Sequence, residues 1–329
     1  MKKKIFVIGS NSFAGANFIN LLLNKKYKVF GSSRSVENNK VFLKYKNNKY
    51  FCNFKFYQID INKDYYKLFK ILDNIKPNII VNFAAQGMVD QSWDNPFDWY
   101  KTNILSNVRL TDYLKNKKYL KKFINFSTPE VYGNCVTKIN SNTKFDPSTP
   151  YALSRMTFDI HLNLINKVNK FPFIITRASN IYGPHQQIYR LVPKIIFSCL
   201  SNRTFELDGT GSTKRSFIFM DDVSNALYKI LLNGKIGETY NISTNEIYSI
   251  KQILNIVKNR MTNKKLKIKI RKDRRFKDLI YNLDSKKIRR DFNWNEKYSL
   301  VEGIDKTIEW ITNNLNYIKK QNKNYVHKK

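Results

Sequence analysis

The chain has 329 residues, a hydrophobic content of 42% and a formal net charge of +34 with the histidines neutral. This length accommodates one large α/β unit or two domains that share a core, and the hydrophobic content argues against a disordered chain. No run of about 18 apolar residues occurs, which argues against a transmembrane helix.

The positive charge is spread along the whole sequence. Lysine and asparagine recur in runs such as 47–49, 115–118 and 319–323, in segments expected to be loops or polar helix faces. A nucleic-acid-binding protein would concentrate its charge on one stripe or arm. We therefore interpret the charge as compositional bias that still attracts an anionic substrate, and we expect neither a nucleic-acid partner nor membrane association.

The cysteines and histidines indicate the cellular compartment of the protein and whether it binds a metal ion. The residues concerned are Cys52, Cys135, Cys199, His161, His185 and His327. They are scattered, without the spacing of metal ligands. An odd number of dispersed cysteines fits a reducing compartment, and the apolar stretch after the basic N-terminus is too short for a signal peptide. The sequence predicts a cytoplasmic protein without a metal ion.

Strands and helices alternate through the first half of the chain. Expected strands span residues 3–9, 28–32, 54–60, 78–83, 123–127 and 173–177. Expected helices span residues 14–24, 64–75, 96–114 and 151–167. This alternation, with largely apolar strands, predicts an α/β fold of the Rossmann type, in which a doubly wound parallel sheet is covered on both faces.

The alternation becomes less regular after Arg177. Expected helices span residues 191–200, 223–232, 250–257 and 302–315, and expected strands span 239–242 and 264–270. No long linker occurs, so the second half should pack on the first. We predict a larger domain over 1–177, with later contributions from about 212–244, and a smaller C-terminal α/β domain over 178–329, whose polar residues 319–329 are loosely held.

A glycine turn joins the first strand to the first helix. Residues 9–15 read Gly-Ser-Asn-Ser-Phe-Ala-Gly, with Ser12 in place of the middle glycine of the usual spacing. Glycines at both ends allow a tight turn and a close backbone approach to a pyrophosphate at the helix N-terminus. The turn predicts a dinucleotide site, although an ordinary strand–helix turn is the alternative. The expected contacts are Gly9, Asn11, Ser12, Phe13 and Gly15.

The residues after the second strand bear on which dinucleotide binds. That strand normally ends in an acid that binds the ribose 2′-hydroxyl of NAD, but here Ser33 and Arg34 follow, with no acid before Glu37. Hydroxyls beside an arginine suit a 2′-phosphate, which favours NADP over NAD; a solvated Arg34 is the alternative. Asp60 and Ile61, after the third strand, are expected beside the adenine, with a helix N-cap as the other role for Asp60.

The segment with the most candidate catalytic residues is 126–133, which reads Phe-Ser-Thr-Pro-Glu-Val-Tyr-Gly. Thr128 and Glu130 leave a buried strand together. Tyr151 and Arg155, further along, lie one helical turn apart on one face. A hydroxyl, a phenol, a cation and a carboxylate are the groups needed to oxidise a carbinol and then move a proton beside the new ketone.

In their order and spacing, these motifs resemble the extended short-chain dehydrogenases/reductases and, within them, the nucleotide-sugar 4,6-dehydratases and epimerases. The resemblance covers nearly the full length and includes residues 82–86 (Asn-Phe-Ala-Ala-Gln), 177–184 and 209–223. It implies an NAD(P)-binding first domain, to which Ala84 and Ala85 contribute, and a mainly substrate-binding second domain. It also implies a homodimer, in which helices 96–114 and 151–167 pair with their copies.

The resemblance implies a role for each catalytic residue. Tyr151 takes the proton from the sugar C4 hydroxyl as a hydride leaves for the nicotinamide, and Thr128 hydrogen-bonds the same oxygen. Arg155 stands where the family has a lysine that holds the nicotinamide ribose, so Tyr151 and Arg155 also contact the cofactor. Arginine keeps the charge but loses the compact ammonium geometry. Glu130 removes the C5 proton, which the new 4-ketone makes acidic.

Pro129 leaves more than one reaction open. The dTDP-glucose dehydratases have an aspartate here, which protonates the leaving C6 hydroxyl, whereas the GDP-mannose dehydratases lack it and still eliminate water. Glu130 would then act as both base and acid, or a water would help. We predict a nucleotide-sugar 4,6-dehydratase, with an NAD(P)-dependent epimerase, 4-reductase or 4-dehydrogenase as the alternative. A non-catalytic nucleotide- or RNA-binding protein on this scaffold is a distant alternative, which Arg155 and the net charge support.

The resemblance also implies residues that bind a nucleotide-diphosphate sugar. Asn180 matches an asparagine on the substrate phosphate, and Arg190 begins a segment that flanks the nucleotide. Arg215 matches an arginine on the diphosphate, and Arg274 resembles a second nucleotide contact. Gln86 resembles the GDP-mannose enzymes, whereas the second half of the chain resembles the dTDP-glucose enzymes more. The sequence therefore leaves the base and the sugar open.

Overall fold

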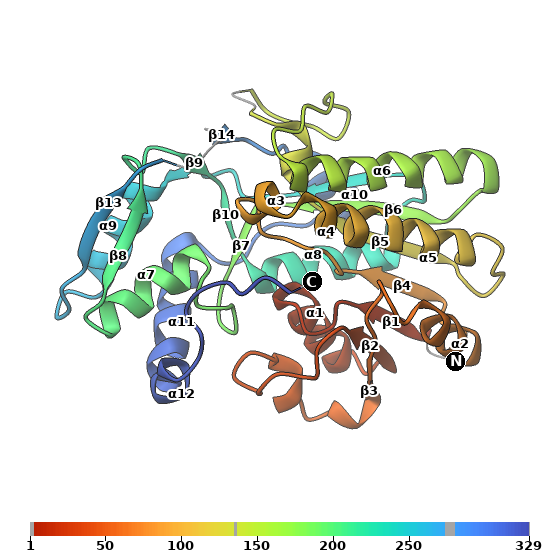
Figure 1. Ribbon diagram of the computed structural model, residues 1–329, viewed down its shortest axis with the longest axis horizontal. Coiled ribbons are helices and arrows are strands. Elements are labelled where there is room, and N and C mark those ends of the chain that lie inside the picture. The colour runs from red at the N-terminus through yellow and green to blue at the C-terminus, as the bar shows by residue number, and fades with distance from the viewer. Residues whose placement is uncertain (1–2, 135–136, 274–279, 329) are drawn as a thin grey trace.

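The computed structural model describes residues 3–134, 137–273 and 280–328, and Figure 1 shows it as a ribbon. A seven-stranded sheet forms its centre, in the order β11-β6-β5-β4-β1-β2-β3. The strands are β1 (Ile5–Ile8), β2 (Val29–Ser33), β3 (Phe54–Gln58), β4 (Ile79–Asn82), β5 (Lys122–Ser127), β6 (Phe173–Ala178) and β11 (Thr239–Ile242). All neighbouring pairs are parallel, which confirms the doubly wound sheet predicted from the sequence.

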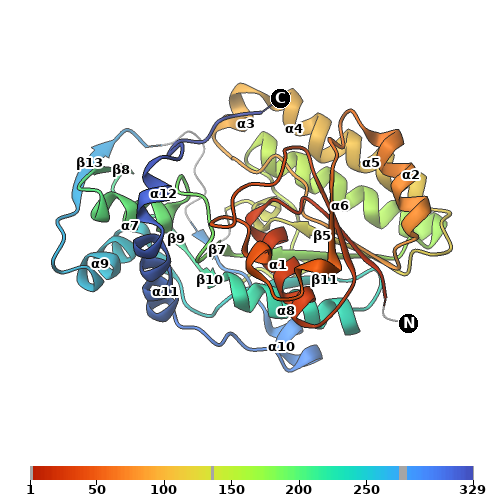
Figure 2. The same ribbon diagram turned by 90° about the horizontal axis from the view of Figure 1, so that it is seen from below.

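Alternate side chains of the sheet face two helical layers. Ile5 and Val7 of β1 belong to one hydrophobic core and Phe6 and Ile8 to another, as the two-residue period of a strand requires. The first core is covered by α1 (Phe13–Asn24), α8 (Met220–Asn233) and α10 (Lys286–Phe292). The second is covered by α2 (Tyr65–Ile75), α5 (Ser106–Leu114) and α6 (Pro150–Asn169). Figure 2 shows these layers on opposite sides of the sheet.

The strand order reverses at β1. Strands β2 and β3 continue on one side of it, whereas β4, β5 and β6 continue on the other. The loops that leave the carboxyl ends of β1 and β4 therefore run to opposite faces. In open parallel sheets, ligands bind in the crevice that such a reversal leaves outside the carboxyl ends of the strands.

The helix predicted over residues 96–114 is present, with a wider turn in its middle. Helices α4 (Pro96–Tyr100) and α5 are joined by a π-helical turn, Lys101–Leu105. Asn103 in this turn is buried. Such turns inside α-helices are frequent at functional sites. A short helix that the sequence pattern did not predict, α3 (Gln91–Asp94), precedes α4.

The remaining elements form a second lobe around its own hydrophobic core. Its helices are α7 (Leu191–Leu200), α9 (Ile250–Arg260), α11 (Leu300–Asn313) and α12 (Leu315–Lys319). Its strands are β7 (Asn180–Tyr182), β8 (Thr204–Asp208), β9 (Lys214–Arg215), β10 (Phe217–Phe219), β12 (Tyr248–Ser249), β13 (Lys267–Arg271) and β14 (Ile280–Tyr281). The sequence predicted α7, α9, α11 and β13. It missed the five-residue strand β8. It also missed β7, β9, β10, β12 and β14, because runs of two or three residues carry no periodic pattern.

Candidate active site

The predicted glycine turn lies at the sheet's reversal point. Gly9 has a φ of +84°, and a Cβ placed there would lie 2.7 Å from the backbone nitrogen of Ala84. A Cβ on Gly15 would collide with the carbonyl oxygen of Gly9. Ser12 takes the middle position by capping α1: its Oγ accepts from the backbone nitrogen of Gly15 (3.0 Å) and donates to the Gly9 carbonyl (2.7 Å). The turn is therefore as tight as a dinucleotide site requires.

Hydrogen bonds fasten this turn to the loop after β2. The backbone nitrogen of Asn11 donates to Ser33 Oγ (2.9 Å), and Asn11 Nδ2 donates to the carbonyl oxygens of Ser35 and Val36 (3.0 Å each). The structure thus brings together the two segments predicted to hold opposite ends of an adenosine diphosphate. Arg34 lies in the same loop and donates from Nη1 to the carbonyl oxygen of Lys328 (3.0 Å).

Asp60 and Ile61 follow β3, as predicted. The Asp60 carboxylate accepts from the backbone nitrogen of Asn62 (2.9 Å). The N-cap position of α2 is Asp64, not Asp60, and Asp64 Oδ2 accepts from the backbone nitrogen of Asp60 (2.8 Å). The N-cap alternative for Asp60 is therefore wrong, because the helix begins one turn later. Ile61 is partly buried and packs against the core beneath α2.

The four predicted catalytic residues come from two elements that face each other. Thr128 caps a short 3₁₀ turn, Pro129–Tyr132, and its Oγ1 accepts from the backbone nitrogen of Glu130 (3.3 Å). Tyr151 stands in the first turn of α6. The start of this helix is fixed by Pro150 and by Thr149, whose Oγ1 accepts from the backbone nitrogen of Ala152 (3.1 Å).

Opposing influences act on the Tyr151 phenol. Burial raises the pKa of Tyr151 above that of a free tyrosine, and this effect prevails. The positive charge of Arg155 and a hydrogen bond with Thr128 lower the pKa, whereas the nearby charge of Glu130 raises it. The hydroxyl, the cation and the carboxylate therefore all lie close enough to affect the phenol, as the sequence predicted.

Arg155 is buried, with 3% of its surface exposed. Its Nη2 donates to the carbonyl oxygen of Phe126 at the end of β5. Nε and Nη1 have no hydrogen-bond partner among the described residues. Buried donors are normally satisfied, so these two orphaned groups, one helical turn from the phenol, fit a ligand that brings hydroxyl oxygens into the crevice. The ribose of a nicotinamide nucleotide is such a ligand.

A buried polar network lies beneath the catalytic residues, and the sequence did not predict it. Asp159 on α6 pairs with Arg177 on β6 (Oδ2 to Nη2, 2.8 Å), and both side chains are at most 1% exposed. Asp159 Oδ2 also accepts from Ser127 Oγ (2.6 Å), and Arg177 donates to the hydroxyl of Tyr132. Burial lowers the pKa of Arg177, but Asp159 and Tyr132 raise it more. The network ties α6 to both ends of the segment that carries Thr128 and Glu130.

A second buried clamp holds the loop after β4. Asn103, in the π-helical turn, accepts from the backbone nitrogen of Gln86 (2.8 Å) and donates to its carbonyl oxygen (3.1 Å). It also donates to Ser154 Oγ (2.9 Å), next to Arg155 on α6. Ala84, in the same loop, donates from its backbone nitrogen to Asn82 Oδ1 (3.2 Å). The predicted residues Ala84, Ala85 and Gln86 thus follow β4 at the edge of the crevice.

The predicted substrate residues fall into two groups. Arg190, at the start of α7, has Nη2 3.8 Å from where a Cβ of Gly87 would lie, and its charge lowers the pKa of Tyr151, so it belongs to the crevice. Asn180 is exposed on β7, and Arg215 on β9 stacks over the ring of Tyr281 (4.3 Å). Both lie in the second lobe. Arg274 lies outside the described residues.

The histidines have structural surroundings. His161 Nε2 is 3.1 Å from Thr111 Oγ1 on α5, as expected for a structural residue. His185 Nδ1 is 2.8 Å from the carbonyl oxygen of Val41, and burial lowers its pKa to about 4. Within the described ranges, no group of three His, Cys, Asp or Glu residues is placed to hold a metal ion, and no described helix has both the length and the apolar character to cross a membrane.

The tail that the sequence predicted to be loosely held makes specific contacts through Tyr325, His327 and Lys328. His327 Nε2 is 2.7 Å from Asp98 Oδ2, and its ring stacks on Trp99 (5.1 Å between centroids). The carbonyl oxygen of Lys328 accepts from Gln86 Nε2 (2.7 Å) as well as from Arg34. The polar composition concealed these contacts because they are made by main-chain and polar groups, which leave no hydrophobic pattern.

The sheet, the glycine turn at its first strand and the tyrosine–arginine pair beside a threonine define an extended short-chain dehydrogenase/reductase. The chain belongs to the GDP-mannose 4,6-dehydratase family, whose model matches residues 6–307.

Relatives and a solved structure agree with this assignment. A dTDP-D-glucose 4,6-dehydratase of Bos taurus is 34% identical over 270 residues, which cover 80% of this chain and 75% of the relative. One of Dictyostelium discoideum is 33% identical, over 96% of this chain and 83% of the relative. The crystal structure of dTDP-glucose 4,6-dehydratase from Bacillus anthracis in complex with NAD is 26% identical, with a TM-score of 0.87 over 96% of this chain and 99% of that chain.

The buried ion pair allows a test of what holds the site together. Replacing Asp159 with asparagine keeps the size of the side chain but leaves Arg177 as a buried charge without its counter-ion. We expect Asp159→Asn to lower the free energy of unfolding by about 3–5 kcal/mol, measured by urea denaturation. The matched control is Asp305→Asn, which breaks the pair with Arg260 at a site where both side chains are well exposed. Such pairs contribute little, so equal effects of the two substitutions would contradict the role given to Asp159.

Proposed function

We propose that this protein is a nucleotide-sugar 4,6-dehydratase, a lyase that works with a bound nicotinamide dinucleotide. The observation that carries the proposal is the position of Glu130, whose charge acts on the same phenol that Arg155 and Thr128 flank. A base beside an oxidising phenol serves a reaction in which a ketone is first made and a neighbouring proton is then removed. Family membership agrees with this reaction.

The residues that would hold the cofactor follow from the crevice. We assign the dinucleotide to residues 1–177 with 212–244, and the nucleotide sugar mainly to 178–329. The glycine turn would face the pyrophosphate, the loop after β2 the adenosine, and the free donors of Arg155 the nicotinamide ribose. When bound, this cofactor supplies a reversible acceptor for a hydride.

Tyr151 would accept the proton of the sugar C4 hydroxyl. The phenolate is the form that can do so, and Arg155 and Thr128 both stabilise it by lowering the pKa of Tyr151 against the effect of burial. Thr128 is also held at the cap of its turn, so its hydroxyl points to a fixed place. The pair would thereby position the C4 oxygen while it becomes a ketone.

Glu130 would carry out the elimination. Its carboxylate takes the C5 proton, and the electron pair left at C5 forms the C5–C6 double bond as the C6–O bond breaks. The leaving hydroxide needs a proton, which Pro129 cannot supply. We propose that Glu130, now protonated, returns that proton to the C6 oxygen, so that one carboxyl group acts as base and then as acid and water departs. The 4-keto-6-deoxy product would be completed by return to C6 of the hydride that left C4 and by a solvent proton at C5.

Pro129 also supports the second candidate, an epimerase, 4-reductase or 4-dehydrogenase, because none of these needs an acid for a leaving hydroxyl. Incubation with dTDP-, UDP-, GDP- and CDP-sugars, followed by mass spectrometry, separates the two. A dehydratase gives a product lighter than its substrate by one water. A product without that loss would favour the second candidate.

The role of Glu130 can be isolated from the oxidation step. The 4-keto-6-deoxy nucleotide sugar already has the ketone, so exchange of its C5 proton with D₂O requires only the base. We expect Glu130→Gln to slow this exchange by roughly 10²–10⁴-fold, followed by mass spectrometry. Tyr151→Phe should retain the exchange although it suppresses conversion of the parent sugar. Exchange at near wild-type rate in Glu130→Gln would show that another group is the base.

Cofactor preference can be tested at Arg34. NADP is slightly favoured because a guanidinium beside Ser33 suits a 2′-phosphate. A charge-assisted contact contributes about 1.5–3 kcal/mol, so we expect Arg34→Asp to raise the Kd for NADP relative to that for NAD by about tenfold or more. Arg203→Asp, the same charge change on the exposed surface of the second lobe, is the control. An unchanged ratio of the two constants in Arg34→Asp would refute a 2′-phosphate site.

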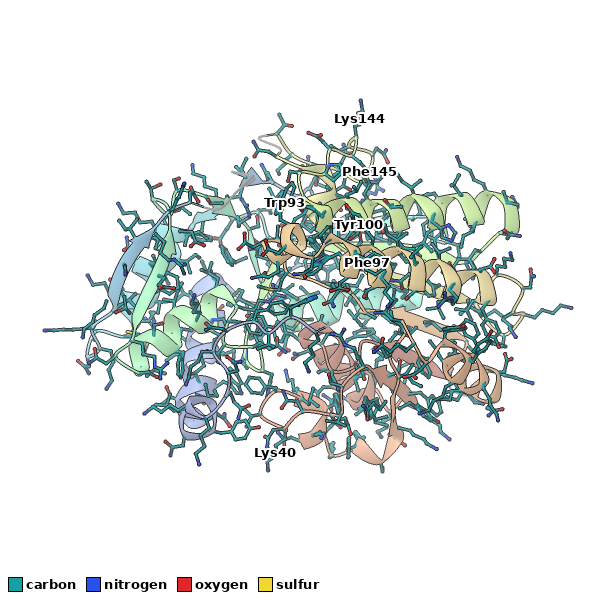
Figure 3. All side chains as sticks on the ribbon, viewed as in Figure 1. Lys40, Trp93, Phe97, Tyr100, Lys144 and Phe145 are labelled. Carbon is teal, nitrogen blue, oxygen red and sulfur yellow. The ribbon has the colours of Figure 1, made fainter. Side chains whose placement is uncertain are left out.

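We also propose that the protein is a homodimer. Helix α6 carries a stripe of exposed apolar side chains at helical spacing: Leu153, Ile160, Leu164 and Val168, of which Val168 is 79% exposed. Phe97 on the neighbouring α4 is 67% exposed, and Figure 3 labels it among the side chains of α4. An apolar stripe of this kind normally packs against another helix, and a second copy of α4 and α6 offers a matching one.

A charge in this stripe should oppose dimerisation. We expect Leu164→Glu to be a monomer by light scattering at micromolar concentration, where the parent protein has the mass of a dimer, because burying an unpaired carboxylate is costly. Ile270→Glu is the matched control: Ile270 is 70% exposed on β13 in the second lobe, and its variant should keep the parent's mass. A monomeric parent protein would contradict the proposal.

A further inference from the structure

Residues 324–328, called the strap below, cross from the second lobe to the nucleotide-binding sheet. Figures 1 and 2 both trace the chain from α12 back towards the N-terminal part of the molecule. The Tyr325 ring packs edge-on against Tyr189 of the second lobe (5.6 Å between centroids). His327 then reaches Asp98 and Trp99 of α4. The strap is thus attached on both sides of the crevice.

The strap engages two side chains predicted to hold ligands. The carbonyl oxygen of Lys328 accepts from Arg34 Nη1 (3.0 Å) and from Gln86 Nε2 (2.7 Å). The other end of the Gln86 amide, Oε1, accepts from the hydroxyl of Tyr325 (3.4 Å). Both ends of this buried amide are therefore occupied by the strap. Lys328 Nζ also donates to Ser35 Oγ (3.0 Å), next to Arg34.

Sheet topology places the strap over the glycine turn. Arg34 follows β2 and Gln86 follows β4, and these two strands are the neighbours of β1 on either side. The turn from Gly9 to Gly15 leaves β1 between them. A single carbonyl oxygen that contacts both Arg34 and Gln86 therefore bridges the ends of the two flanking strands, above the turn where a pyrophosphate would approach the backbone.

We propose that the strap is an internal competitor of the dinucleotide, which must displace it from Arg34 and Gln86 to occupy the crevice. The proposal rests on the proposed cofactor site. The strap buries little aliphatic surface: Val326 is its one aliphatic residue and is 56% exposed. Its remaining contacts are polar or aromatic, and its departure would uncover one core side chain, Trp99, on which the His327 ring stacks. Segments with few buried apolar contacts open at low free-energy cost.

Competition predicts that removal of the strap tightens dinucleotide binding. Apparent affinity falls in proportion to the fraction of molecules that are competent to bind, so a strap docked about nine-tenths of the time weakens binding about tenfold. We expect a chain that ends at Gln321 to bind NADH about tenfold more tightly than the full chain, measured by the fluorescence of bound NADH. An unchanged or higher Kd in the shortened chain would overturn the proposal.

Substitutions in the full chain provide a second test that does not depend on truncation. His327→Ala removes the contacts with Asp98 and Trp99 and should lower the Kd for NADH. Val326→Ala is the matched control, because the Val326 side chain is 56% exposed and the substitution keeps the main chain of the strap. Equal Kd values for His327→Ala and Val326→Ala would count against the strap. Failure of both the full and the shortened chain to bind NADH would instead overturn the cofactor site itself, and the strap proposal with it.

Discussion

The buried pair of Asp159 and Arg177 is the interaction on which the catalytic geometry depends. Two charges removed from water are tolerated only when they are paired and their remaining hydrogen-bonding capacity is used. Here Ser127, Asn125 and Tyr132 use most of that capacity, and Arg177 Nε has no partner among the described residues. Because these partners come from β5, α6, β6 and the 3₁₀ turn, the network fixes the distance between the helix that carries the phenol and the loop that carries the base. The catalytic residues lie above this network, at the crevice.

The site itself balances burial against charge. Tyr151 is partly buried, which raises the pKa of its phenol and makes a phenolate costly, and Arg155 offsets part of that cost with a permanent positive charge. A guanidinium differs from the family's ammonium group in having several donors in a fixed plane. One of these donors, Nη2, donates to the carbonyl oxygen of Phe126, and this hydrogen bond sets the orientation of the other donors. The substitution thus keeps the electrostatic effect and changes how the cation is anchored.

Sequence patterns predicted the elements with a periodic apolar pattern and the motifs with fixed spacing. They missed single buried polar residues. The parallel sheet and its long helices follow from alternating apolar periods, and the glycine turn and residues 126–133 are local motifs with fixed spacing. Asp159, Arg177 and Asn103 were missed because a buried polar residue is recognised by its partners, which lie far away in the sequence. The strap was missed for the same reason. The residues that position the site are therefore less visible in the sequence than those that carry out the chemistry.

The π-helical turn at Lys101–Leu105 shifts the phase of its helix. An extra residue in one turn rotates everything before it by about 100° relative to everything after it. Helix α5 can therefore keep Leu110 and Leu114 in the core while α4, upstream, turns Phe97 outward. Deleting one residue from this turn would restore a regular helix and bring these two faces into register. Because of this turn, one continuous helix places side chains in the core, at the crevice and on the outer surface.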